Sequence, residues 1–227
     1  MNAFRKFGLV IPVLLLATTQ PVALAQDANN PIDPSPTFGV WNRFYGDDFS
    51  RLQALGNITY GDWFYRISAE GQIDYASADQ PGKVNFNGAN FMVARLFELA
   101  DGRHRVGFGG IVSYFEGKGT AAGLSGVSVS KFGSWKVITL TTFQRGNGIS
   151  KIEFQPGLYR DFSGGWYFRS HPRMLFDLET DENEVPIGAG FGRTFASADR
   201  VYNFFFEPQY DLADDRPMLY AGMKILF

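Results

Sequence analysis

The segment that decides the fold reads RLQALGNITYGDWFYRISAEGQIDY and runs from Arg51 to Tyr75. Gly61 and Asp62 form a two-residue turn between two arms of alternating character, which predicts a β-hairpin. In the second arm, apolar and small residues occupy one row, which begins at Trp63 and ends at Tyr75, and polar residues follow Phe64 in the other. A row bracketed by aromatic residues is typical of a strand that faces lipid between two aromatic girdles. The hairpin therefore predicts a sheet with one face in a membrane.

The same alternation recurs along the rest of the chain. Nine further strand-like segments are separated by turn residues, and they cover 84–99, 103–116, 121–132, 134–145, 149–162, 165–178, 184–196, 200–211 and 216–227. With the two hairpin arms they make eleven, and Phe38 to Tyr45 can supply a twelfth. Strands in lipid must close on themselves to satisfy their backbone groups, and bacterial single-chain barrels have even strand numbers. We predict an all-β fold, an antiparallel transmembrane β-barrel of about 12 strands, with ten as the alternative.

The N-terminal residues predict export. Arg5 and Lys6 precede an apolar run and a small-residue cleavage motif that ends at Ala25, which together are typical of a secretory signal peptide. Residues 26–37, QDANNPIDPSPT, are polar and proline-rich and predict a flexible, exposed N-terminal segment. The expected organisation is a signal peptide over 1–25, this segment over 26–37 and an outer-membrane barrel over 38–227.

The composition excludes several classes of function. Removal of the two basic residues of the signal peptide from the 21 of the chain leaves 19 against 23 acidic ones, a net charge of −4, which argues against a nucleic-acid partner. The chain has no cysteine, so it has no disulfide framework, no thiol nucleophile and no cysteine metal site. It also lacks an H-E-x-x-H motif, and we expect neither a metal nor a cofactor.

The C-terminal third carries a resemblance to a known family. The run GGWYFRSHPRMLFDLETDENEVPIGAGFGRTF begins at Gly164, and VYNFFFEPQYDL and the closing strand RPMLYAGMKILF follow it. From about Gly133 to Phe227 the sequence resembles a family of Gram-negative outer-membrane proteins loosely described as transporters. The resemblance implies an outer-membrane barrel with a transport role. The last strand also resembles the terminal signal of such proteins, which implies recognition by the barrel-assembly machinery through the strand that ends at Phe227.

Alternation within WYFRSHPRMLFDLE, residues 166 to 179, places charges on one side of a strand. A charged side chain on the lipid face at mid-depth costs roughly 2–4 kcal/mol, so the charged row is expected to face the lumen. The same reasoning applies to the other strands. The expected lumen-lining residues along a solute path are Arg66, Glu70, Arg169, His171, Arg173, Asp177, Glu207 and Asp211; Asp74, Arg105, Lys151, Glu153 and Lys224 are also expected to point inward.

Three functions are compatible with a charged lumen. The first is a narrow channel or transporter for small solutes, porin-like in character, in which rings of charge select ions. The second is a structural barrel in which the charges pair and plug the lumen, since 12 strands lie between the filled small barrels and the open porins. The third is a lipid hydrolase that uses His171; Ser170 cannot serve as its nucleophile because adjacent strand residues point to opposite faces. We expect no enzymatic activity. The row Gly188, Gly190 and Gly192 is expected to let the strand curve or other side chains pack closely, and the alternative is that it leaves lumen space for a solute or an inserted loop.

Overall fold

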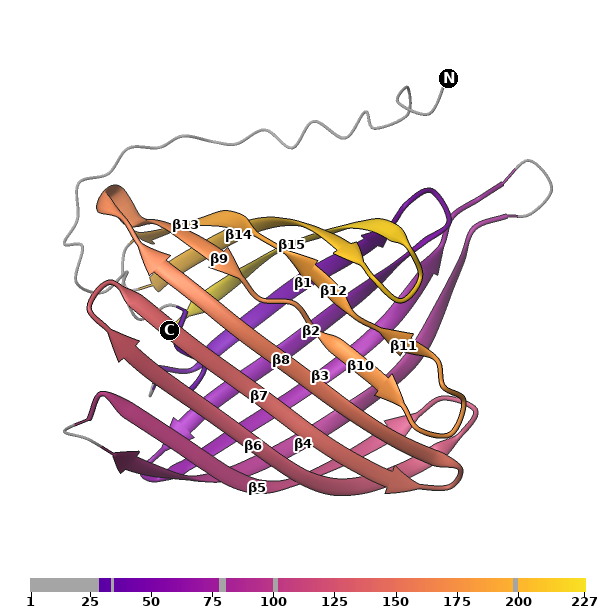
Figure 1. The fold of residues 1–227 in the computed structure, drawn as a ribbon, viewed down its shortest axis with the longest axis horizontal. Helices are drawn as coiled ribbons and strands as arrows, with labels where there is room; N and C mark the ends of the chain where they lie inside the picture. The colour runs from indigo at the N-terminus through magenta and orange to yellow at the C-terminus, as the bar shows by residue number, and fades with distance from the viewer. Residues whose placement is uncertain (1–28, 34, 78–80, 100–101, 198–199) are drawn as a thin grey trace.

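The computed structural model describes residues 29–33, 35–77, 81–99, 102–197 and 200–227, which form a single closed sheet (Figure 1). Its fifteen strand segments are β1 (Thr37–Tyr45), β2 (Phe49–Tyr60), β3 (Trp63–Asp74), β4 (Lys83–Leu99), β5 (His104–Phe115), β6 (Gly119–Phe132), β7 (Trp135–Gly146), β8 (Ile149–Asp161), β9 (Trp166–Ser170), β10 (Met174–Asp177), β11 (Asn183–Glu184), β12 (Pro186–Gly188), β13 (Gly190–Ser197), β14 (Arg200–Asp211) and β15 (Arg216–Leu226). A short 3-10 turn, η1 (Ser163–Gly165), precedes β9. The predicted signal peptide lies outside the described residues.

The fifteen segments make twelve barrel strands. β9 and β10 pair with β8 in one continuous register, so they are a single strand that is interrupted at 171–173. β11, β12 and β13 likewise keep one offset to their neighbours and are one strand interrupted at Val185 and Ala189. The offset on β8 places Pro156 opposite Pro172. Neither proline has a backbone N–H to donate, which explains the interruption.

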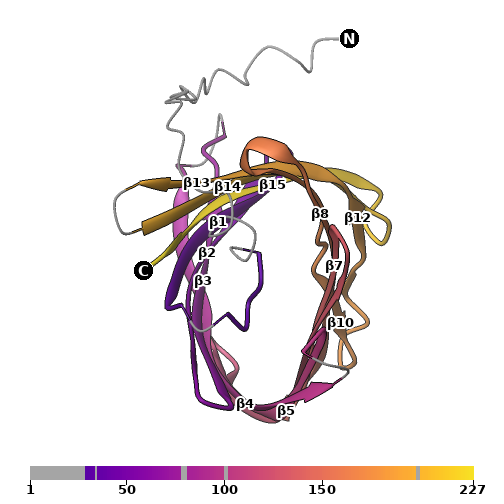
Figure 2. The same ribbon diagram turned by 90° about the vertical axis from the view of Figure 1, so that its left-hand side faces the viewer.

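Closure occurs between β1 and β15, which pair antiparallel from Thr37↔Leu226 to Phe44↔Leu219. All other pairs are antiparallel neighbours, so no sheet edge is left among the described strands. The prediction of a closed antiparallel barrel with twelve strands is confirmed, and β1 is the twelfth strand that the sequence made possible. We call the end that holds Thr37 and Leu226 the terminal end and the opposite end the distal end. Viewed along the barrel, the wall has an oval outline (Figure 2).

The two faces of the wall differ as the alternation predicts. Large apolar side chains are exposed on the outer face; examples are Ile67, Phe108, Leu124, Phe191 and Phe206, each more than half exposed. The alternate residues of the same strands are buried inside. In β3, for example, Phe64 and Arg66 are buried between the exposed Trp63 and Ile67. No helix among the described residues is long and apolar enough to cross a bilayer.

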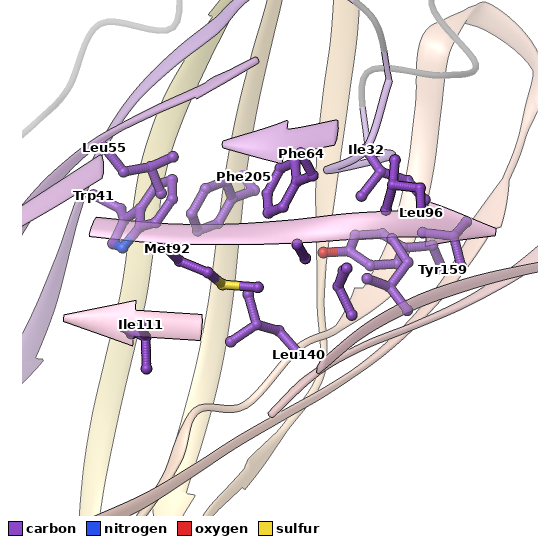
Figure 3. Packing of buried hydrophobic residues seen from close by; sticks show 14 of the residues in the cluster. Ile32, Trp41, Leu55, Phe64, Met92, Leu96, Ile111, Leu140, Tyr159 and Phe205 are labelled. Carbon is purple, nitrogen blue, oxygen red and sulfur yellow. The ribbon is translucent and has the colours of Figure 1, made fainter. Parts of the chain in front are cut away.

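The interior holds an apolar cluster beside its charged groups. The cluster joins side chains of β1 to β8 with Tyr167, Phe205 and Tyr220, and Figure 3 shows Leu55, Phe64, Met92 and Leu140 among its members. Met92, Ala94 and Leu96 explain why β4 carries apolar residues on both rows, since this inner row packs inside the barrel. The lumen is therefore only partly charged.

Part of the N-terminal segment lies inside the barrel (Figure 2). Ile32 is fully buried in the same cluster as Phe64 and Leu96 (Figure 3), and Asn29 is 2% exposed. The Asn203 amide donates to Asn29 Oδ1 at 2.9 Å, and the Arg105 guanidinium donates to the carbonyl of Ile32 at 3.2 Å. The segment 26–37 was expected to be exposed, and this expectation is wrong at Asn29 and Ile32. The segment is mostly polar, but its one isoleucine can be buried in the apolar part of the lumen.

Candidate functional site

A deeply buried ion pair of the lumen joins Arg169 on β9 to Glu207 on β14. Arg169 is 2% exposed and Glu207 is not exposed, and Arg169 Nε donates to Glu207 Oε2 at 2.5 Å. The other oxygen of Glu207 accepts the backbone N–H of His171 at 2.9 Å and the Gln209 amide at 2.7 Å. The carboxylate thus binds β9 to β14 and replaces a ladder hydrogen bond at the break in the strand.

β13 lies between β9 and β14, and it has glycines where these two strands have large inward side chains. Gly190 lies opposite Arg169, and a Cβ at Gly190 would strike the backbone of Phe206 and Glu207. A Cβ at Gly192 would strike the Tyr167 phenol, whose hydroxyl donates to Asn203 Oδ1 at 2.6 Å. The close packing expected of this glycine row is therefore what the structure shows.

A second ion cluster crosses the lumen. Arg173, in the break between β9 and β10, donates from Nη1 to Glu70 of β3 at 2.5 Å and from Nη2 to Glu153 of β8 at 2.8 Å. All three side chains are mostly buried, and Gln155 donates to Glu153 as well. One guanidinium is shared by two carboxylates, so this cluster carries a net negative charge.

Two further arginines carry positive charge that no carboxylate neutralises at contact distance. Arg43 on β1 is 3% exposed and Arg66 on β3 is 9% exposed. Within the described part of the chain, neither forms an ion pair within 4.0 Å, and Arg43 Nε and Nη1 and Arg66 Nε lack hydrogen-bond partners. Arg43 stacks over the Tyr220 ring at 4.4 Å. Arg66 interacts electrostatically with Glu153 and, with the opposite sign, with Arg173 and Arg43. Buried donors without acceptors are suited to bind an anion.

His171 lies beside these groups. Its Nδ1 is 2.6 Å from the Tyr159 hydroxyl, and its ring also packs against Tyr159. Ser170 donates instead to the carbonyl of Gly188 at 2.6 Å, so it points away from the imidazole. In the described residues no serine hydroxyl lies within hydrogen-bond distance of His171, and no group of three metal-ligating side chains occurs.

The remaining predicted residues lie near the distal end. Asp177 pairs with Lys151 at 3.1 Å and accepts the backbone N–H of Glu179 in the following turn. Asp211 accepts the backbone N–H groups of Val185 at 2.9 Å and Ala213 at 3.0 Å. Both carboxylates therefore stabilise the backbone near a turn. The carboxylates of the two central clusters bind arginine side chains instead. Like charges are not gathered in separate rings, because opposite signs pair across the lumen.

Sequence reasoning missed Arg43 and the pair formed by Arg51 and Glu184. Arg51 of β2 contacts Glu184 of β11 across the lumen, and the Tyr45 hydroxyl donates to the same carboxylate at 3.2 Å. Arg43 lies on the same row of β1 as Trp41 and Tyr45. Two aromatic residues on one row are also typical of a row that faces lipid, so the sequence did not mark this row as the inner one. The charge of Arg43 was the available signal, since an arginine at mid-strand favours the lumen.

Comparison with known proteins agrees with the fold. No protein-family model matches the chain, and no curated protein sequence matches it. Among solved structures, the KdgM porin superposes with a TM-score of 0.57 at 7% identity and covers 84% of this chain and 99% of its own. The NanC porin superposes with a TM-score of 0.60 at 8% identity and covers 84% of this chain and 98% of its own. The chain therefore shares its barrel fold with these outer-membrane porins, and the resemblance of its sequence to outer-membrane barrels is confirmed at the level of fold.

Proposed function

We propose that the protein is a channel of the bacterial outer membrane that admits small solutes through a narrow lumen and prefers anions. The observation that carries the proposal is the pair Arg43 and Arg66, whose buried guanidinium groups face the lumen without a contacting carboxylate in the described chain. An anion entering the lumen would supply the charge and the acceptors that these donors lack. The predicted signal peptide and the terminal strand for the assembly machinery support the location.

The shared fold supports the choice of a channel over other roles. One of the similar structures is a KdgM porin in complex with disordered oligogalacturonate, which encourages a search among small solutes. The lumen-lining set of Arg66, Glu70, Arg169, His171, Arg173 and Glu207 would form the walls of the path. The paired charges narrow this path, so we expect a small conductance. His171 has a tyrosine as its side-chain partner and no serine hydroxyl beside it in the described part of the chain, so the geometry gives no support to a lipid hydrolase.

A plugged structural barrel is the second candidate, and one observation favours it. Ile32 and Asn29 occupy the interior near the terminal end and are bound there by Arg105 and Asn203. If these contacts persist, the N-terminal segment obstructs the lumen and no solute passes.

One experiment in planar bilayers tests both candidates. Ion selectivity and single-channel conductance are recorded for the mature protein, for a variant lacking residues 26–33, and for Arg43→Gln/Arg66→Gln. Arg145→Gln is the matched control, because Arg145 is exposed on the outer face of β7. We expect anion selectivity that falls several-fold in the double variant and is unchanged in the control. Current only after the deletion would identify the segment as an obstruction. If neither the mature protein nor the deletion variant conducts although both are folded, the channel proposal is overturned. Cation selectivity of the mature protein would overturn the anion preference.

A further inference from the structure

Three of the four tryptophans lie on the outer face at the terminal end, and each has an arginine directly opposite on the adjacent strand. The register pairs are Trp63↔Arg95, Trp135↔Arg160 and Trp166↔Arg193. Trp63 is 44% exposed and Trp166 is 48% exposed, and the three arginines stand on the same outer rows. We call these six residues the Trp-Arg belt.

The arginines of the belt rest on aromatic rings. The guanidinium carbon of Arg160 lies 5.3 Å from the Trp135 ring centroid, and that of Arg193 lies 5.4 Å from the Trp166 centroid. Arg95 lies 5.6 Å from the ring of Phe97. Stacking of this kind holds the planar group by its face and leaves its N–H edges available for acceptors.

In the described parts of the chain, no carboxylate neutralises these charges at contact distance. Within the described residues, none of Arg95, Arg160 and Arg193 has a carboxylate within 4.0 Å, and Arg193 Nε is buried without a hydrogen-bond partner. Three cations with free donor edges therefore surround one rim of the barrel. Their complement is an anion with several acceptor oxygens, of which phosphate is the group that the arginine fork fits best.

The distal rim has the opposite character. Its outward aromatic residues include Tyr114 and Tyr210, and their hydroxyls donate to the carboxylates of Glu116 at 3.0 Å and Asp215 at 2.5 Å. A phosphate would meet negative charge there. The aromatic residues Tyr114 and Tyr210 of the distal rim are thus paired with carboxylates, whereas Trp135 and Trp166 of the terminal rim are paired with arginines.

Turn lengths indicate which membrane leaflet the Trp-Arg belt faces. Terminal-end turns include the two-residue connections Gly61–Asp62 and Gly133–Ser134, whereas the distal end holds the longer connections 75–82 and 178–182. Bacterial barrels have short turns on the periplasmic side and longer loops outside. The belt then lies at the depth of the phospholipid headgroups of the periplasmic leaflet.

We propose that the Trp-Arg belt binds the phosphate groups of anionic phospholipids, with tryptophan holding the guanidinium and the guanidinium contacting the phosphate. This interaction is independent of whether the lumen conducts. A basic residue near an anionic membrane surface favours anionic lipid by roughly 5-fold, so three sites predict a clear enrichment.

The test measures lipids that stay bound to the refolded full-length mature protein. The protein is placed in nanodiscs of equal parts phosphatidylglycerol and phosphatidylcholine, released in a mass spectrometer, and the retained lipids are counted. Variants are Arg95→Gln/Arg160→Gln/Arg193→Gln, which keeps polar side chains but removes the charges, and Arg145→Gln, which removes the charge of an exposed outer-face arginine near the distal end. Circular dichroism and mobility of unheated samples establish that each protein is folded.

The expected result is enrichment of phosphatidylglycerol on the native protein and on Arg145→Gln, with a loss of roughly 5-fold or more in the triple variant. Equal retention of the two lipids by the native protein would overturn the proposal. So would an unchanged enrichment in the triple variant, or an equal loss in Arg145→Gln, because either result would mean that the lipid does not recognise the belt.

Discussion

Removal of Arg169 should destabilise the barrel far more than removal of an exposed arginine. Arg169 is 2% exposed and its partner Glu207 is fully buried, so Arg169→Met leaves a carboxylate in the interior without its cation. Breaking a buried ion pair from one side costs about 3–5 kcal/mol. Glu207 keeps two hydrogen bonds, from the backbone N–H of His171 and from Gln209, and we therefore expect the lower end, about 3 kcal/mol.

A second variant separates loss of the pair from loss of the cation alone. In Arg169→Met/Glu207→Gln the interior holds no charge at this point, and the glutamine oxygen can still accept the N–H of His171. Replacing both members of a buried pair is often neutral, so the double variant should lie within about 1 kcal/mol of the native protein. Arg216→Gln is the control, because Arg216 and its partner Asp214 are more exposed and such a pair contributes about 0–1 kcal/mol.

The assay is reversible urea unfolding of protein refolded in lipid vesicles, followed by the fluorescence of the four tryptophans. The free energies of unfolding of the four proteins are compared at one lipid composition. A loss for Arg169→Met no larger than that for Arg216→Gln would refute the reasoning, since it would mean that the pair is hydrated. A double variant as unstable as Arg169→Met would also refute it, because the uncompensated carboxylate could then not be the cause.

Two further predictions use the same lumen. Gly192→Ala should lower the free energy of unfolding by about 1–3 kcal/mol, because its Cβ would displace the Tyr167 phenol from Asn203. Gly56→Ala, where the nearest atom to the new Cβ is 3.6 Å away, should cost little in the same urea assay, and an equal loss at both glycines would contradict the packing argument. Arg173→Gln frees the carboxylates of Glu70 and Glu153 and should shift bilayer selectivity toward cations, whereas an unchanged reversal potential would mean that this cluster does not face the conduction path.

The strand order could be predicted from the sequence because outer and inner rows differ in polarity and a closed antiparallel wall pairs neighbours only. β1 and the strands from β5 to β8 lie close to their predicted ranges for this reason. The interruption at 171–173 could not be foreseen, since it depends on Pro156 and Pro172 meeting across two strands, and that register is set by the whole barrel. Neither proline alone would mark the place.

The inward direction of Arg169 and Arg173 followed from alternation, but the identity of their partners did not. Glu207 lies 38 positions from Arg169, and Glu70 lies 103 positions from Arg173. Alternation predicts whether a side chain faces the lumen or the lipid. It does not predict which side chains of distant strands meet across the lumen. The burial of Ile32 was hidden for a related reason, because a single isoleucine in a polar segment has no period from which its environment could be inferred.

The oval outline of the wall bears on what could pass through it (Figure 2). Twelve strands fix the perimeter of the barrel, and for a given perimeter a circle encloses the largest area. A flattened section of the wall therefore encloses less area than a round one of the same perimeter. In the proposed channel, a flattened section would therefore favour a flat or extended solute over a branched one of equal mass.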